Sequence, residues 1–186
     1  MTIWTIGHST RPIGEFIELL QAHGIRQLVD VRTVPRSRHN PQFSRENLPA
    51  SLQDAGIEYR HFPALGGLRH AAADSINTGW RNASFRGYAD YMQTPQFEEA
   101  VGKLVEIAAV APTAIMCAEA VPWRCHRSMI GDALLVRGAT VLDIMSATNA
   151  KPHSLTPFAK VHGTAITYPG NTRDDAGNLN LELKLD

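Results

Sequence analysis

The feature that most constrains the fold is an alternation of short β-prone runs with longer stretches of helical period. The β-prone runs occupy residues 3–6, 28–31, 57–62, 114–117 and 140–144. Between them, apolar residues recur at the spacing i, i+3, i+4 and i+7 of one helix face, as in Ile13, Phe16, Ile17 and Leu20. Strands that alternate with helices build a mainly parallel sheet through right-handed crossovers. The sequence therefore predicts a three-layer α/β fold, with about five mainly parallel strands and helices on both faces.

Two breaks in this alternation suggest how the chain is organised. Residues 63–84 are irregular, and loops of that length inside a domain are usually functional. We therefore expect residues 66–84 to cover a ligand cleft. Beyond residue 145, alternating leucines predict a terminal strand over residues 179–185, which residues 165–168 could join. We interpret residues 1–186 as a single domain, with a βα core over 1–145 and an extension over 146–186 packed on it as a C-terminal strand or hairpin.

The composition excludes several classes of protein. Lysine plus arginine and aspartate plus glutamate number 18 each, so the formal net charge is +0. Bulk charge therefore predicts neither a nucleic-acid coat nor attachment to a membrane surface. Two cysteines do not make a disulfide framework, and we expect both to be reduced. The sequence opens without a basic, apolar leader and contains no window with the roughly 18–20 apolar residues of a membrane span. We expect a cytoplasmic protein with no membrane partner.

Polar, chemically capable side chains gather just after the ends of the predicted strands. In open parallel sheets, ligands bind in the crevice beyond the carboxyl ends of the strands. We therefore expect five side chains to lie around one cleft at that edge: His8, Asp30, Arg32, Cys117 and Glu119. The full set of candidates that follow the first four strands is His8, Ser9, Arg11, Asp30, Arg32, Arg36, Gly66, Gly67, Cys117, Glu119, Arg124, Cys125, His126 and Arg127.

The segment 117–127 carries the most specific signal, because it joins a predicted strand end to a helix start. Backbone N–H groups and the dipole at a helix N-terminus attract anions and lower the pKa of a thiol. We expect Cys125 in the first turn of that helix, where Arg124 and Arg127 would favour its thiolate. We expect Cys117 to be the more buried cysteine, because it ends a central strand. The alternative is that both cysteines are small core residues.

Several short motifs occur in order along the chain. They are Thr5-Ile6-Gly7-His8-Ser9, Asp30-Val31-Arg32 with Pro35-Arg36-Ser37, His61-Phe62-Pro63 with Leu65-Gly66-Gly67, Phe85-Arg86-Gly87-Tyr88, and Cys117-Ala118-Glu119 through Cys125-His126-Arg127. Over roughly residues 3–145, the chain resembles the bacterial and archaeal family called domain of unknown function 488. The family's name records that its activity is not established. The resemblance therefore implies candidate site positions and no reaction.

The first functional hypothesis is an enzyme, of open reaction class, that acts on a small anionic substrate such as a nucleotide or another phosphorylated or carboxylated metabolite. His8, oriented by Asp30 or Glu119, would move protons together with Glu119, while Cys117 or Cys125 would act as the nucleophile. Arginine forks suit phosphate and carboxylate. The residues expected to bind the substrate are Ser9, Arg11, Arg32, Arg36, Gly66, Gly67, Arg124, His126 and Arg127.

Two alternatives come from other classes of protein. A nucleic-acid-binding module would use the arginine-rich loop 32–45 and aromatics such as Trp80 and Trp123, although zero net charge counts against strong backbone binding. A metal-binding or sensor protein without turnover would use Cys117, Cys125 and His126, with His8 or Asp30 as a fourth ligand. The eight-residue spacing of the cysteines differs from the close pairs of structural zinc sites, so we assign no metal ligands. Cofactor and oligomeric state are left open.

Overall fold

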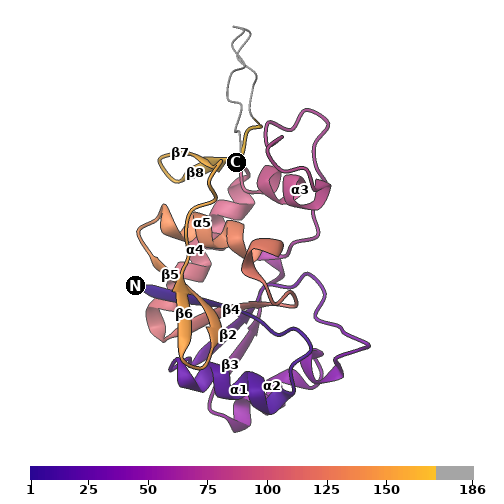
Figure 1. Ribbon diagram of the computed structural model, residues 1–186, viewed down its shortest axis with the longest axis vertical. Helices are drawn as coiled ribbons and strands as arrows, with labels where there is room; N and C mark the ends of the chain where they lie inside the picture. Colours follow the sequence, from indigo (N-terminus) through magenta and orange to yellow (C-terminus); the bar gives the residue numbers. More distant parts are fainter. Residues whose placement is uncertain (171–186) are drawn as a thin grey trace, which may run out of the picture.

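Six strands form one sheet in the order β3-β2-β4-β1-β5-β6 in the computed structural model, which describes residues 1–170 (Figure 1). Strands β1 to β5 pair in parallel, and β6 pairs antiparallel with β5 at one edge. The bounds are β1 (Thr2–Gly7), β2 (Gln27–Asp30), β3 (Glu58–His61), β4 (Thr113–Cys117), β5 (Thr140–Ser146) and β6 (Asn149–Pro152). The predicted mainly parallel α/β sheet is confirmed. The added strand β6 has a polar sequence with no apolar alternation, so no pattern marked it.

Helices cover both faces of the sheet, as predicted. The bounds are α1 (Ile13–Ala22), α2 (Leu48–Asp54), α3 (Ala83–Tyr91), α4 (Pro95–Val110) and α5 (Arg127–Leu135). Figure 1 shows α1 and α2 below the sheet and α4 and α5 above it. Successive strand residues serve opposite faces: Leu28 packs in the core under α1 and α2, and Val29 in the core under α3, α4 and α5. None of the helices within residues 1–170 is long and apolar enough to cross a membrane.

Helix α3 was not expected from the sequence. Its N-cap is Asn82, whose side chain accepts hydrogen bonds from the backbone N–H groups of Ser84 and Phe85 at 2.8 and 3.3 Å. Gly87, in the middle of α3, lowers helix propensity. However, a Cβ at that position would lie 2.6 Å from the carbonyl oxygen of Arg69. The glycine that hides the helix pattern is therefore the one that lets the preceding loop pack against α3.

The irregular stretch before α3 reaches the cleft only near its two ends. Leu68 and Ser84 line the pocket described below. The middle is held instead by Asp90 of α3, whose Oδ1 accepts a hydrogen bond from Nδ2 of the fully buried Asn77 at 2.8 Å. The expectation that all of residues 66–84 cover the cleft is therefore wrong for the middle, because hydrogen bonds to Asp90 fasten it to α3.

The last described residues form a small hairpin. Strand β7 (Lys160–His162) pairs antiparallel with β8 (Ala165–Thr167) as a separate two-stranded sheet. The predicted C-terminal strand or hairpin is thus confirmed, but with a different partner. The strand predicted over residues 179–185 lies outside the described residues, and β8 pairs with β7, which the sequence pattern did not mark.

A buried charged network fastens the segment after β6 to α5 and β5. His153 Nε2 lies 3.2 Å from Asp132 Oδ1, and His153 Nδ1 lies 3.1 Å from Asp143 Oδ2. The three side chains are only 7%, 0% and 11% exposed. Ionised carboxylates only accept hydrogen bonds, so both ring nitrogens donate and His153 is an imidazolium. Although burial opposes the charge, hydrogen bonds to Asp132 and Asp143 raise the pKa of His153 to about 9.

The contribution of His153 to the free energy of unfolding is expected to fall as the pH rises from about 6.5 to about 9. An unfolded His153 titrates near 6.5, so its protonation favours folding fully below that pH and no longer does so above about 9. The raised pKa corresponds to a loss of up to roughly 3 kcal/mol. Urea unfolding at about pH 6 and about pH 9.5 measures it. The free energy of unfolding of the native chain minus that of His153→Gln should fall by this amount between the two pH values, because the other titrating groups cancel in the difference. An unchanged difference would contradict the assignment.

Candidate functional site

The topology opens a pocket at the carboxyl end of β4. Strand β4 lies between β1 and β2. The chain leaves β1 and β2 through helices on one face of the sheet but leaves β4 through α5 on the other. Neighbouring strands whose connections leave toward opposite faces create a ligand crevice between them. A pocket of about 710 Å³ lies there, and its lining includes His8, Arg32, Cys117, Glu119, Cys125 and His126. Four of the five residues expected around one cleft therefore line it. The fifth, Asp30, is fully buried.

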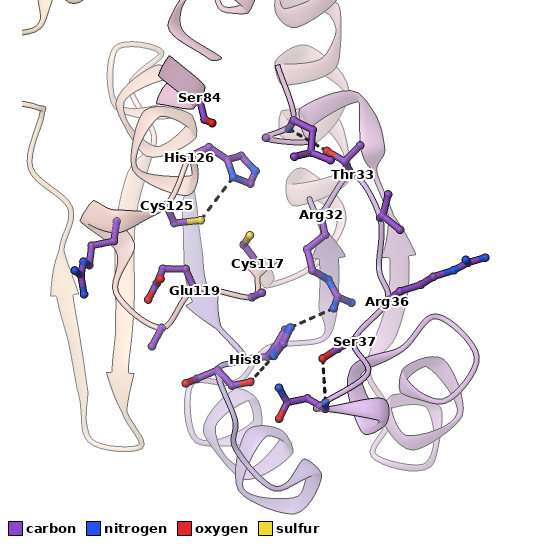
Figure 2. Close-up of a pocket in the computed structure, with 18 of the residues that line it drawn as sticks. His8, Arg32, Thr33, Arg36, Ser37, Ser84, Cys117, Glu119, Cys125 and His126 are labelled. Atoms are coloured by element: carbon purple, nitrogen blue, oxygen red, sulfur yellow. Dashed lines mark hydrogen bonds between the residues drawn. The ribbon is translucent and has the colours of Figure 1, made fainter. Parts of the chain in front are cut away.

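Three side chains converge in this pocket, as Figure 2 shows. Cys117 ends β4, Cys125 follows the 3-10 turn Pro122–Arg124, and His126 directly precedes α5. One sulfur or nitrogen atom from each lies within 4.8 Å of the others, and Cys125 Sγ is 3.6 Å from His126 Nδ1. His126 Nε2 lies 3.2 Å from the carbonyl oxygen of Val31, so Nε2 carries a proton. The Cys125–His126 contact is therefore either thiol with imidazole or thiolate with imidazolium.

The surroundings favour a thiolate at Cys125. The neighbouring Cys117 thiol, contact with His126 and the charge of Arg127 lower the pKa of the Cys125 thiol to about 3, against the effect of burial. The neighbouring Cys125 and burial raise the pKa of Cys117 well above its usual value. The two thiols titrate as a pair, which holds one negative charge between the two sulfur atoms.

Arg127 supplies a buried positive charge beside the two cysteines. It is 1% exposed, its Nη1 lies 3.2 Å from Thr5 Oγ1, and its Nη2 donates to the backbone carbonyl of Glu119 at 2.5 Å. Its Nε has no hydrogen-bond partner in the described part of the chain, and no carboxylate there lies within 4.0 Å. Thr5 Oγ1 in turn donates to Asp143 Oδ1 at 2.6 Å, so Thr5 links Arg127 to that carboxylate. A buried guanidinium without a direct counter-ion favours a negative charge at Cys125 or on a ligand.

Two expectations about the cysteines are wrong. Cys125 does not lie in the first turn of α5, because Pro122 opens a separate 3-10 turn and α5 begins only at Arg127. Cys125, at 4% exposed, is also the more buried of the two, whereas Cys117 is half-buried because the end of β4 opens into the pocket. Both cysteines are free thiols, as expected. The activation of Cys125 therefore depends on side-chain contacts rather than on a position inside the helix.

Arg32 presents a buried guanidinium to the pocket, and Asp30 holds it in place. Arg32 Nε and Nη2 donate to the two carboxylate oxygens of Asp30 at 2.9 and 2.5 Å, and Nη2 also donates to the carbonyl of Phe43 at 2.8 Å. The Tyr59 hydroxyl and the Arg32 backbone N–H donate to the same carboxylate. Arg32 Nη1 contacts only His8 among the described residues, at 3.2 Å, which leaves one N–H for a ligand. Asp30 thus positions Arg32, and it does not orient His8 directly.

His8 is held in its neutral form. Its Nδ1 donates to the carbonyl of Ser9 at 2.7 Å, its Nε2 accepts from Arg32, and its ring stacks on Phe43 at 4.2 Å. Burial, together with the charge of Arg32, lowers the pKa of His8 to about 4. The lone pair on Nε2 is already used by Arg32. The role of proton carrier stays a prediction for His8, and it would require Arg32 to move.

Gly66 and Gly67 are sites of close packing. A Cβ at Gly66 would lie 2.4 Å from Thr33 Oγ1, and one at Gly67 would lie 2.5 Å from His126 Nδ1. Real Cβ atoms do not approach neighbours that closely. Gly67 therefore sets the place of the His126 ring, and with it the contact between that ring and Cys125.

The Gly67→Ala variant is expected to push the His126 ring away from Cys125. The thiolate then loses a hydrogen-bond donor, so the pKa of the Cys125 thiol, measured from the pH dependence of its alkylation, should rise by roughly 1–3 units. Gly102→Ala is the matched control, because a Cβ at Gly102 meets nothing within 4 Å and alanine favours the α4 helix by roughly 0.5–1 kcal/mol. Equal pKa values of the Cys125 thiol in the two variants would show that Gly67 does not position His126.

The other residues predicted to bind a ligand differ in where they lie. Ser9, Arg36 and Arg124 line the pocket, and both of these arginines are exposed. Figure 2 shows Arg36 directed away from the cysteines, so it lies at the rim of the pocket. Arg11 is outside the lining, where Nη1 donates to a backbone carbonyl at 2.5 Å and Nε lies 3.4 Å from Glu15. Arg11 is thus held by the end of β1 and by Glu15 of α1, and it does not reach the pocket.

Several lining residues were missed by the sequence analysis. Four lie on loops, and two lie in the first turn of α3. They are Thr33, Val34, Ser37 and Leu68 on loops, and Ser84 and Phe85 in α3. Ser84 and Phe85 begin α3, and the absence of that helix from the prediction removed any reason to place them there. The motif that contains Phe85 was the one available signal. Glu119, which was predicted, is an exposed residue at the pocket, and its Oε1 accepts from the backbone N–H of Val121 at 3.2 Å.

Cys117, Cys125 and His126 have the chemistry and spacing to hold a thiophilic metal ion. Zinc binds thiolate at about 2.3 Å and imidazole at about 2.0–2.1 Å, which places neighbouring ligand atoms of a tetrahedron about 3.6 Å apart. The 3.6 Å between Cys125 Sγ and His126 Nδ1 equals that spacing. The carbonyl of Val31 on His126 Nε2 is the kind of partner that orients a ligating histidine. His8 and Asp30, weighed as fourth ligands, are both bound to Arg32.

Fold and pocket together define an α/β protein with a cysteine–cysteine–histidine cluster at the carboxyl ends of parallel strands. The chain belongs to the family described as Domain of unknown function DUF488, which matches residues 12–134, about two thirds of its length. The match includes Arg32 and the segment from Cys117 to Arg127, while His8 lies just before it. No curated protein and no solved structure matches the chain significantly. Family membership indicates no reaction, so the geometry has to carry the functional argument.

Proposed function

We propose that this chain is an enzyme that acts on a small anionic substrate in the pocket at the end of β4, with Cys125 as its nucleophile. The observation that carries the proposal is the 3.6 Å contact between Cys125 Sγ and His126 Nδ1, with His126 Nε2 held by the carbonyl of Val31. A thiolate beside an imidazolium pairs an activated nucleophile with a proton donor. Cys125 Sγ would attack an electrophilic atom of the substrate, and the leaving group would take the proton from His126 Nδ1.

The charges around the pocket support an anionic substrate. Arg32, Arg36 and Arg124 line it, whereas Glu119 is the one carboxylate among the lining residues. Arg32 has one N–H left after its bonds to protein groups, and a buried guanidinium is the donor that suits phosphate or carboxylate best. The buried charge of Arg127 adds to the positive potential. The pocket volume of about 710 Å³ is in the range of small-molecule sites.

The test separates binding from turnover. A panel of phosphorylated and carboxylated metabolites is screened against the full chain by thermal unfolding, and the binders are then assayed for conversion by mass spectrometry. A binder should raise the unfolding midpoint of both the native chain and Cys125→Ser, while only the native chain converts it. Arg32→Lys should weaken binding by about tenfold or more, because a lysine cannot reproduce the guanidinium fork. Absence of any anion-dependent shift, or equal conversion by Cys125→Ser, would refute the proposal.

A second candidate function, metal binding, is favoured by the spacing within the cluster of Cys117, Cys125 and His126. Three protein ligands with a fourth position open to a pocket are typical of catalytic zinc. Elemental analysis of chain purified without chelator distinguishes the two functions. About one zinc per chain, with conversion lost on chelation and restored by zinc, would replace the thiolate mechanism by a metal-based one. Full conversion by zinc-free chain would exclude it.

A further inference from the structure

We propose that Cys117 resolves the adduct that a hydroperoxide forms on Cys125, so that the pocket closes a reversible disulfide between Cys117 and Cys125. The inference rests on the proposed function in one respect, the nucleophilic role of Cys125. It goes beyond that function by assigning Cys117 a chemical role and by naming the class of oxidant.

The geometry that supports the proposal is the position of the second sulfur. The two Sγ atoms lie within 4.8 Å of each other, and both cysteines line the same pocket. Cys117 is anchored at the end of β4, while Cys125 follows a 3-10 turn in the loop that leads to α5. A disulfide needs its sulfur atoms at about 2.0 Å, so the loop over residues 118–125 has to shift by a few ångströms or less. The half-buried Cys117 faces the pocket, so a ligand adduct on Cys125 forms within its reach.

The chemistry balances in two steps. First, the Cys125 thiolate attacks the terminal oxygen of the hydroperoxide R–O–O–H, the O–O bond breaks, and Cys125 becomes a sulfenic acid. The released alkoxide takes a proton from His126 Nδ1 and leaves as an alcohol, or as water when the probe is hydrogen peroxide. Second, Cys117 attacks the Cys125 sulfur, the S–O bond breaks, and the thiol proton of Cys117 leaves with the hydroxide as water. The two sulfur atoms are oxidised to a disulfide while the peroxide is reduced, and an added dithiol reverses the change.

The experiment uses hydrogen peroxide on the full chain and counts thiols, which is direct because the chain holds only two cysteines. The native chain should lose both free thiols and the mass of two hydrogen atoms, and dithiothreitol should restore both. Cys117→Ser should instead gain one oxygen atom at Cys125 in a form that dimedone captures. Cys125→Ser should keep its Cys117 thiol, with a rate of thiol loss lower by about tenfold or more.

The possible failures are distinguishable. If Cys125 takes up oxygen in the native chain while Cys117 stays a free thiol, the resolving role is refuted and the nucleophilic role stands. If oxidation joins two chains rather than the two cysteines of one chain, as a non-reducing gel would show, the resolving role is refuted as well. If Cys125 reacts neither with peroxide nor with iodoacetamide in the folded chain, the proposed function fails together with this inference.

Discussion

Replacement of Asp30 by alanine is expected to lower the free energy of unfolding by about 3–5 kcal/mol. Asp30 is fully buried and accepts hydrogen bonds from Arg32 Nε, Nη2 and backbone N–H and from Tyr59. Its loss leaves a guanidinium that is 6% exposed without a counter-ion, and burying an unpaired charge costs far more than the pair itself contributes. Urea unfolding of the native chain and the variant at neutral pH measures the difference.

Two further variants make this test specific. Glu58→Ala breaks the exposed pair between Glu58 and Arg60, whose side chains are 55% and 44% exposed, and it should cost less than about 1 kcal/mol. The double variant Asp30→Ala with Arg32→Leu removes the unpaired charge and should recover part of the loss. An Asp30→Ala variant as stable as Glu58→Ala would show that Arg32 finds water or another partner, and that the pocket is less enclosed than the structure indicates.

Replacement of His126 by asparagine is expected to raise the pKa of the Cys125 thiol by roughly 1–3 units. Direct contact at 3.6 Å and the charge of the imidazolium both favour the thiolate, and the variant loses the charge while it keeps a polar side chain. The effects of the neighbouring Cys117 and of the charge of Arg127 remain, so the pKa should stay below that of an ordinary thiol. The pH dependence of iodoacetamide alkylation, followed at Cys125 by mass spectrometry, gives the pKa of this thiol in the native chain and in the variant.

The matched control for this variant is His39→Asn, which replaces an exposed histidine of the loop after β2. Its alkylation profile should match that of the native chain. If His126→Asn also leaves the profile unchanged, the low pKa owes nothing to the histidine, and His126 is not the proton donor of the proposed reaction.

The parallel core of the fold could be predicted because each strand and helix carries its own local pattern. One such pattern is Thr94 followed by Pro95, an N-cap before a proline at the first helical position, and α4 begins there with Thr94 as its cap. Helix α3 could not be predicted, since Gly87 suits a tertiary contact and opposes the local propensity. Strand β6 lies at the edge of the sheet and its side chains are mostly exposed. It therefore lacks the apolar alternation that would have marked it as a strand.

The candidate site could be predicted in outline and not in its interactions. The rule that ligands gather at strand carboxyl ends is topological, so it correctly brought His8, Arg32 and Cys117 to one pocket. It could not foresee that Arg32 would occupy the lone pair of His8, because a side-chain contact between residues far apart in sequence leaves no local pattern. The prediction that Cys125 lies in the first turn of α5 was also wrong. A 3-10 turn over Pro122–Arg124 comes first, and α5 begins only at Arg127, after Cys125.

The proposed function depends most directly on Cys125 being a thiolate at and below neutral pH. The alkylation rate at a single neutral pH does not test it, because a thiolate of low pKa is also a weaker nucleophile, with a Brønsted slope of about 0.4–0.5, and the two effects nearly cancel. The shape of the pH profile does test it. Iodoacetamide alkylation of Cys125 in the native chain should change by less than about tenfold between pH 5 and pH 8, because its pKa of about 3 lies below that range. A rate that rises about tenfold per pH unit, approaching a plateau only near pH 8.5 as for an ordinary thiol, would contradict the account.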